Sequence, residues 1–144
     1  MLEIKYTLYD ETIDQEIVLE CGTHLIALIE GDLKIIINDI LFFDEPYMNL
    51  LELSVQLYKW LHKVIKNDFM YNSINNEEPV LNFHQINNKY WGINSIWEKC
   101  NSFNIRNSEL YKCLRTFIKS LDKDLLIKYG IKTIDIIKAK KYIP

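Results

Sequence analysis

The chain has 144 residues, 49% of them apolar and 26% charged, and a net charge of −3, the balance of an ordinary soluble globular protein. That length is close to the modal size of one domain, so we expect a single core rather than two. Only four glycines and three prolines are present, which excludes low-complexity linkers, Walker-type phosphate loops and glycine-rich dinucleotide fingerprints.

The N-terminal region predicts β-strands. Residues 2–9 alternate between apolar and polar side chains, which is the period of a half-buried strand. Two apolar runs at residues 25–29 and 33–37 flank a Glu-Gly-Asp sequence at 30–32. Glycine beside an acidic residue predicts a hairpin turn there, because glycine adopts positive φ at little cost. Residues 38–39, Asn-Asp, predict a second turn.

A long, widely buried helix is predicted over residues 47–66. Its polar positions recur at spacings of three and four residues, which is one stripe along a helix, and most of the other positions are apolar. The preceding Asp-Glu-Pro at 44–46 predicts the start of this helix, because it combines an N-capping acid with a proline tolerated in the first turn. The polar stripe consists of Asn49, Glu52, Gln56, Lys59, Lys63 and Lys66.

A β-hairpin is predicted after this helix. Residues 79–86 and 89–98 are strand-like and are joined by an Asn-Asn pair at 87–88. Asparagine enters left-handed conformations more readily than most residues, so this pair suits a two-residue turn. In that register His84 faces Trp91.

The C-terminal third predicts a second long helix. It begins near Asn107 or Ser108, and Gly130 is placed to cap its C-terminal end. Residues 131–144 carry spaced isoleucines that predict a further short helix in a loosely packed segment.

With a short strand predicted at residues 69–74, the order is strands, helix, strands, helix. We therefore expect residues 1–144 to form a single α+β domain. Its mostly antiparallel sheet of about six strands packs on two main helices as a single pair of layers.

Cysteine usage and the apolar runs predict a cytoplasmic bacterial protein. The three cysteines are odd in number and show no CxxC spacing, which is typical of reduced thiols. We see no signal peptide, and no apolar run approaches the ~20 residues of a membrane-spanning helix. The chain also has 22 Ile, 15 Lys and 13 Asn, whose AT-rich codons point to a low-GC genome.

Acidic and basic residues are divided unevenly along the chain. Residues 1–79 hold 15 acidic and 5 basic side chains, a net charge of −10, whereas residues 80–144 hold 5 and 12, a net charge of +7. Three interpretations follow: the halves attract each other, an acidic face docks a basic partner, or the basic C-terminal region contacts nucleic acid. An acidic protein with only two arginines is poorly suited to binding nucleic acid. For the second, the candidate partner-binding residues are Asp10, Glu11, Asp14, Glu16, Glu77 and Glu78.

The residues that most often carry chemistry show no catalytic or metal-binding pattern. His24, His62 and His84 lie in no HExxH or zinc spacing, and the N-terminal acids lack the alternation of a calcium loop. Cys21 lies close to His24 in the chain, without an orienting third group or an oxyanion hole nearby. We therefore predict no catalytic residue, no cofactor and no metal.

Two stretches of the chain resemble a known group of proteins. The first runs through Gly31-Asp32-Leu33, Phe42-Phe43-Asp44-Glu45-Pro46, Leu50-Leu51-Glu52-Leu53 and Lys59-Trp60-Leu61, and the second is Tyr90-Trp91-Gly92-Ile93-Asn94-Ser95-Ile96-Trp97. Over about residues 25–120 they resemble small bacterial immunity proteins of polymorphic or contact-dependent toxin systems. The resemblance implies a cytoplasmic protein that blocks a cognate toxin domain without chemistry of its own. It transfers no family binding residue to this sequence.

From these features we expect an immunity or antitoxin-type protein, not an enzyme, that binds a cognate basic toxin domain stoichiometrically. The alternative is a small-ligand module or enzyme with a pocket between the sheet and the first helix, which would require an apolar cavity with convergent polar groups. A third interpretation is a homodimeric accessory protein that uses an exposed strand edge. No membrane partner is expected, and the sequence does not predict the oligomeric state.

Overall fold

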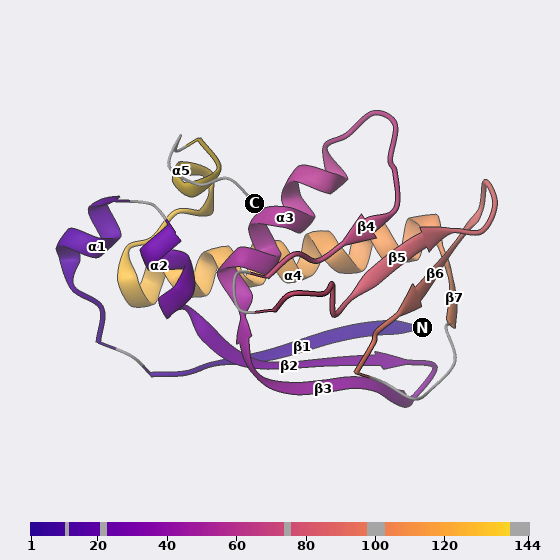
Figure 1. Ribbon diagram of the computed structural model, residues 1–144, viewed down its shortest axis with the longest axis horizontal. Coiled ribbons are helices and arrows are strands. Elements are labelled where there is room, and N and C mark those ends of the chain that lie inside the picture. Colours follow the sequence, from indigo (N-terminus) through magenta and orange to yellow (C-terminus); the bar gives the residue numbers. More distant parts are fainter. Residues whose placement is uncertain (11, 21–22, 74–75, 98–102, 139–144) are drawn as a thin grey trace.

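The computed structural model describes residues 1–10, 12–20, 23–73, 76–97 and 103–138. These residues form five helices and seven strands in two antiparallel sheets (Figure 1). The predicted α+β class and the antiparallel strands are confirmed. The strands divide between a three-stranded and a four-stranded sheet instead of forming one sheet of about six.

The three-stranded sheet has the order β1-β2-β3, with β1 at Leu2–Leu8, β2 at Glu30–Ile37 and β3 at Ile40–Asn49. Strand β1 confirms the alternation of residues 2–9. The turn between β2 and β3 is also confirmed, since Asn38 and Asp39 have φ values of 50° and 64°, as a tight hairpin turn requires.

The turn predicted at residues 30–32 is wrong, because these residues belong to β2. Gly31 pairs with Leu8 on one side and Met48 on the other. A Cβ at Gly31 would overlap the backbone carbonyl of Thr7, with Leu50 Cδ1 only 2.7 Å away. Glycine at this position therefore allows neighbouring segments of the chain to approach closely, and it does not reverse the chain direction.

The strand-like run at residues 25–29 is also not a strand. Two short helices precede β2, α1 at Gln15–Glu20 and α2 at Thr23–Leu28. Leu25, Ile26 and Ile29 are all buried, and their spacing places them on one face of a helical turn. Periodicity alone does not separate a buried helix from a buried strand over so short an apolar run.

Helix α3, at Leu50–Leu61, begins later and ends earlier than predicted. Residues 44–46 do not open the helix, because Asp44 and Glu45 pair with Lys34 and Leu33 and so extend β3. The helix is buried on almost every side. Even Glu52, in the predicted polar stripe, is completely buried.

The four-stranded sheet has the order β4-β5-β6-β7. Its strands are β4 at Phe69–Met70, β5 at Asn82–Gln85, β6 at Tyr90–Asn94 and β7 at Phe103–Arg106. All four are shorter than, or lie outside, the predicted strand ranges at 69–74, 79–86 and 89–98. The C-terminal ends of two of those ranges, residue 74 and residue 98, lie outside the described residues.

The predicted register of the β5–β6 hairpin is wrong by one residue. His84 lies opposite Gly92 rather than Trp91, because residues 86–89 separate the two strands and the Ile86 N–H bonds the Tyr90 carbonyl (3.0 Å), so Asn87-Asn88 is not a two-residue turn. The side-chain oxygen of Asn87 closes this loop by accepting hydrogen bonds from the backbone N–H groups of Lys89 (2.8 Å) and Tyr90 (3.0 Å).

Helix α4, at Asn107–Tyr129, confirms both the predicted start and the predicted cap. Gly130 has a φ of 69°, and the Gly130 and Ile131 N–H groups donate to the last carbonyls of the helix. Helix α5, at Thr133–Lys138, is the predicted short helix. Ile131 and Ile136 are buried, so the described part of the tail is packed, and residues 139–144 lie outside the described residues.

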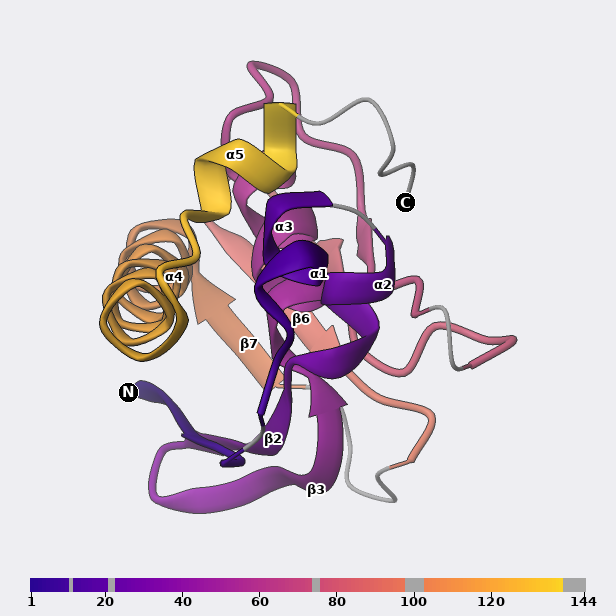
Figure 2. The same cartoon turned by 90° about the vertical axis from the view of Figure 1, so that its left-hand side faces the viewer.

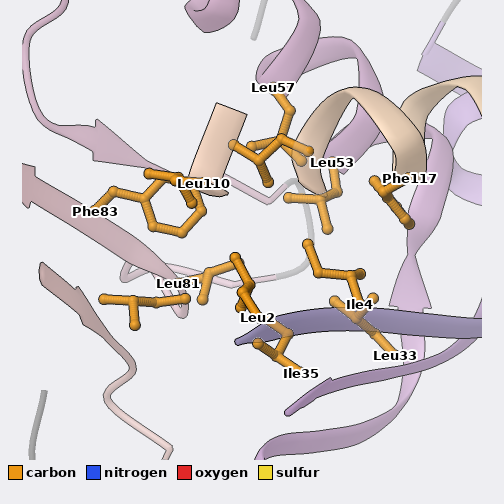
Figure 3. Close-up of a pocket in the computed structure, with 12 residues that line it drawn as sticks. Leu2, Ile4, Leu33, Ile35, Leu53, Leu57, Leu81, Phe83, Leu110 and Phe117 are labelled. Carbon is orange, nitrogen blue, oxygen red and sulfur yellow. The ribbon is translucent and has the colours of Figure 1, made fainter. Parts of the chain in front are cut away.

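Both sheets and both long helices contribute to one core. Figure 1 shows the three-stranded sheet along one side of the molecule, with α3, α4 and the four-stranded sheet across from it. Figure 3 shows the side chains that meet at the centre. They are Leu2, Ile4, Leu33, Ile35, Leu53, Leu57, Leu81, Phe83, Ile93, Leu110, Leu114 and Phe117. Within the described ranges, no helix combines the length and the apolar character needed to cross a membrane.

The β5–β6 register makes a specific prediction for Gly92, where a Cβ would overlap the imidazole ring of His84. Gly92→Ala is expected to lower the free energy of unfolding by about 1–3 kcal/mol, because the ring must move. Adding Gly92→Ala to His84→Ala should cost less than adding it to the wild-type protein, because the ring that the new methyl group would meet is then absent. Urea denaturation of all four proteins gives the comparison, and a fully stable Gly92→Ala would contradict this register.

Candidate functional site

The predicted partner-binding acids differ in what they already contact. The exposed Asp10 carboxylate accepts a hydrogen bond from Lys128 of α4 and forms an ion pair with it. This contact lowers the pKa of Asp10 and raises the pKa of Lys128. At this point, attraction between the acidic and basic parts of the chain is realised inside the protein.

Four of the other predicted acids, Asp14, Glu16, Glu77 and Glu78, are exposed, and their local roles differ. Asp14 caps α1, since its side-chain oxygen accepts a hydrogen bond from the Glu16 N–H (3.0 Å). Glu16 lies in the first turn of that helix. Glu77 and Glu78 lie in the segment before β5, and Glu11 lies outside the described residues. Helix capping therefore accounts for Asp14, whereas no hydrogen bond or ion pair within the described part of the chain engages the carboxylates of Glu16, Glu77 and Glu78.

An irregularity in β3 presents a tyrosine that the sequence reading did not single out. Leu33 pairs with Glu45 and Gly31 with Met48, so Pro46 and Tyr47 together oppose the single residue Asp32. This is a β-bulge. It tolerates Pro46, which has no N–H to donate to the sheet. The bulge leaves Tyr47 with a φ of 56° and its side chain 69% exposed.

A hydrogen-bonded relay fixes this bulge. The Tyr47 N–H donates to the Tyr9 hydroxyl (3.1 Å), and that hydroxyl donates to the Asp32 carboxylate. The bond to Asp32 is also the main cause of the raised pKa of Tyr9. The two tyrosine rings meet edge to face at 5.4 Å. A bulky residue at positive φ is strained by about 1–3 kcal/mol, and such strain concentrates at functional positions.

A cleft of about 300 Å³ opens beside Tyr47. Its lining combines aromatic, acidic and amide side chains from four separate parts of the chain. The lining residues are Glu30, Pro46, Tyr47, Met48, Asn49, Tyr71, Ser73, Asn76 and Trp97.

The buried polar stripe of α3 supports this cleft from behind. The Tyr71 hydroxyl lies 2.8 Å from the Glu52 carboxylate, to which it donates. Gln56 exchanges two hydrogen bonds with the backbone of Asn72, at 2.7 Å and 3.0 Å. These bonds hold residues 71–73 against α3. The first half of the predicted polar stripe, Asn49, Glu52 and Gln56, is therefore internal and positions one wall of the cleft, whereas Lys63 is exposed.

Two of the predicted acidic stretches adjoin residues at Tyr47 in the chain, although Glu78 itself lines a separate groove beside β4 and β5. Asp10 follows Tyr9, which packs on the Tyr47 ring, and Glu77 follows Asn76, which lines the cleft. Figure 2 shows the end of β3 between the N-terminal segment and the loop that precedes β5. We call this region the Tyr47 face, and define it as Tyr9, Asp10, Glu30, Asp32, Pro46, Tyr47, Asn76, Glu77, Glu78 and Trp97.

Sequence reasoning missed Tyr9, Glu30, Tyr47 and Trp97 as site residues. One local signal was available, since a proline inside a strand-like segment marks a bulge or an edge. The other residues meet only through the tertiary fold.

The central cavity tests the small-ligand interpretation. It holds only about 10 Å³, barely the space of one water molecule, and all of its lining side chains are apolar. The pocket predicted between the sheet and the first long helix is therefore filled by side chains (Figure 3). A wider surface groove lies between β1 and α4. Two of its polar groups, Glu109 and Cys113, already bond the backbone of Leu2.

Titratable groups give no indication of a metal or nucleophilic centre. Within the described ranges, no three His, Cys, Asp or Glu side chains are grouped so that they could hold a metal ion. Burial raises the pKa of the Cys113 thiol to about 11, the opposite of what a reactive thiolate needs. His62 is exposed and stacks on Tyr58 at the end of α3. His24 lies in α2.

Comparison with known proteins gives a family without an assigned activity. The family model described as a domain of unknown function, DUF7878, matches residues 4–126. No curated protein and no solved structure matches the chain. The matched range includes the whole Tyr47 face and ends inside α4.

The strained backbone of Tyr47 predicts an unusual substitution result. Tyr47→Asn should change the free energy of unfolding by less than ~1 kcal/mol, because asparagine accepts positive φ more easily and this offsets the lost ring contact with Tyr9. Leu33→Ala, a buried control in the same sheet, should cost about 2–5 kcal/mol. If chemical denaturation shows equal losses for the two variants, Tyr47 is a folding residue and not a displayed one.

The Cys113 thiol should react slowly near neutral pH. In a Cys21→Ser/Cys100→Ser background, the rate of alkylation by iodoacetamide should keep rising through roughly pH 10, because a raised pKa leaves little thiolate below it. The same protein in urea provides the control and should level off above about pH 8.5. A plateau at that lower pH in the folded protein would contradict the burial of the thiol.

Proposed function

We propose that this chain, which belongs to the DUF7878 family, is a non-enzymatic protein that binds a basic protein domain and blocks it stoichiometrically in the cytoplasm. The mode of action is that of an immunity protein acting on its cognate toxin. The observation that carries the proposal is the Tyr47 face, where a strained, exposed tyrosine lies near two acidic stretches.

The composition of this face suits a basic protein surface. It contains five acidic residues, Asp10, Glu30, Asp32, Glu77 and Glu78, and of these Asp10 is already paired with the neighbouring Lys128. Complementary charge accelerates the encounter with a basic partner and selects against acidic ones. Exposed tyrosine and tryptophan side chains provide the central contacts that most often dominate binding energy. Charge thus attracts the partner, and the aromatic side chains retain it.

The two other interpretations have less support. A small-ligand module needs an enclosed pocket with convergent polar groups, and the central cavity is apolar and almost filled. A strand-edge dimer needs an accessible edge. The bulge, Pro46 and the neighbouring Asp44 make β3 a poor template for pairing, and α4 packs against β1 with Glu109 bonded to the Leu2 N–H.

The first experiment is affinity capture with the tagged protein from a lysate of its source cells, followed by a salt titration. Supporting results are a basic protein bound one to one, released as salt rises, and inhibited in its own activity by an equimolar amount of this chain. A captured protein whose activity is unaffected at a saturating concentration would contradict the proposal.

Charge reversal provides the matched test of the face. Glu77→Lys/Glu78→Lys should weaken binding of that partner at least about tenfold at low salt, mainly through slower association. The single variant Glu77→Lys has a matched control in Asp135→Lys, which reverses one charge on α5, at the far end of the molecule from β3 in Figure 2. The control should bind the partner with wild-type affinity. Affinities are measured by surface plasmon resonance at two salt concentrations. Equal affinities for Glu77→Lys and Asp135→Lys would remove this part of the face from the interface.

A further inference from the structure

We infer that the cleft beside Tyr47 receives one arginine side chain of the partner protein, held by the Glu30 carboxylate and by the rings of Tyr47 and Trp97. This inference rests on the proposed function and specifies the chemistry of its central contact. Three features support it: a carboxylate without a partner among the described residues, two partly exposed aromatic rings that contact no cation among those residues, and the size of the cleft.

Glu30 supplies the negative charge. Glu30 is half-buried and lines the cleft, and among the described residues its carboxylate has no hydrogen bond or ion pair. The position of the residue is fixed, because its backbone carbonyl accepts the Tyr9 N–H (3.1 Å) at the start of β2. A carboxylate partly removed from water is best compensated by a cation with N–H donors.

Tyr47 and Trp97 supply aromatic surface. Tyr47 is 69% exposed and Trp97 is 40% exposed. Among the described residues, the ring of Tyr47 pairs with the ring of Tyr9, and the ring of Trp97 stacks on Phe43 at 6.1 Å, with no further ring or cation contact. Neither ring therefore holds a cation of the described chain, and cations favour such open ring faces.

Among the described residues that line the cleft, none is Lys or Arg. Within that part of the chain, the cleft has the carboxylate and the aromatic rings of a cation site without a cation. A cation from a basic partner would complete the site.

The size and polarity of the cleft select arginine. About 300 Å³ is at the lower limit for a ligand pocket and suits one side chain better than a cofactor. A guanidinium group is planar, stacks on aromatic rings and presents several N–H donors at once. Those donors match the Glu30 carboxylate and the side-chain oxygens of Ser73 and Asn76. Lysine offers a more strongly hydrated point charge that stacks less well.

Titration of the whole protein with N-acetyl-arginine amide, followed by NMR, tests this cleft without the partner. The reporter is the Trp97 indole N–H. The other two indoles are distinguishable because they are buried and already donate, Trp60 to the Asn67 carbonyl (2.7 Å) and Trp91 to the Tyr111 hydroxyl (3.0 Å). We expect a saturable shift of the Trp97 signal with a dissociation constant of about 1–10 mM.

Matched probes and variants define the result. N-acetyl-norleucine amide and N-acetyl-lysine amide should bind at least about tenfold more weakly than the arginine compound. Glu30→Gln keeps the shape of the side chain and removes its charge, and it should weaken arginine binding about tenfold, as should Tyr47→Ala. Asp135→Asn is the control and should leave the titration unchanged. Equal binding of the lysine or norleucine compound, or no saturable shift, would overturn the assignment to arginine.

The captured partner then separates this inference from the proposed function. If Glu30→Gln still binds and inhibits the partner with wild-type affinity, the cleft is not the anchor and the proposed function stands. The inference is supported by two results together. Glu30→Gln lowers the affinity for the partner about tenfold, and replacing one partner arginine by lysine also lowers it about tenfold. Combining the two substitutions must then cause no further loss, because both remove the same contact.

Discussion

The burial of α3 on almost all of its faces is the constraint on which the rest of the structure depends. Internal hydrogen bonds stabilise the polar side chains of a helix in this position, because an unpaired polar group away from water is costly. Glu52 and Gln56 form such bonds with Tyr71 and the backbone of Asn72. The segment at 71–73 is thereby fixed beside the end of β3, and the same bonds that stabilise the interior place a wall of the surface cleft.

The start of α3 also determines how β3 ends. The Leu50 N–H donates to the Ile29 carbonyl (3.1 Å), which ties the first turn of the helix to the segment that leads into β2. Strand β3 must reach that point while remaining paired with β2, and the extra residue at the Pro46–Tyr47 bulge takes up the mismatch. A smaller residue at position 47 would satisfy the same backbone. The presence of an exposed tyrosine there is consequently better explained by binding than by folding.

Sequence reasoning succeeded where local chemistry decides the structure. The alternation of β1, the turn at Asn38–Asp39 and the glycine cap of α4 are each determined by residues close in the chain. It failed where distant contacts decide. The bulge that keeps residues 44–46 in β3 depends on pairing with β2. The β5–β6 loop is a separate case, because the Asn87 side chain that closes it bonds only nearby residues, and the register was missed for want of a local signal for the longer loop. The Tyr47 face, like the bulge, depends on distant contacts, because it is assembled from five separate segments.

The uneven division of charge along the chain has two physical explanations, and both apply to different residues. Attraction between the halves accounts for Asp10, which pairs with Lys128. It does not account for Glu30, Glu77 or Glu78, which form no ion pair with any described residue. A protein whose charges served only its own folding would have little reason to leave these carboxylates beside an exposed tyrosine. Part of the uncompensated charge of the N-terminal half therefore lies on the Tyr47 face, where it would suit the basic partner proposed above.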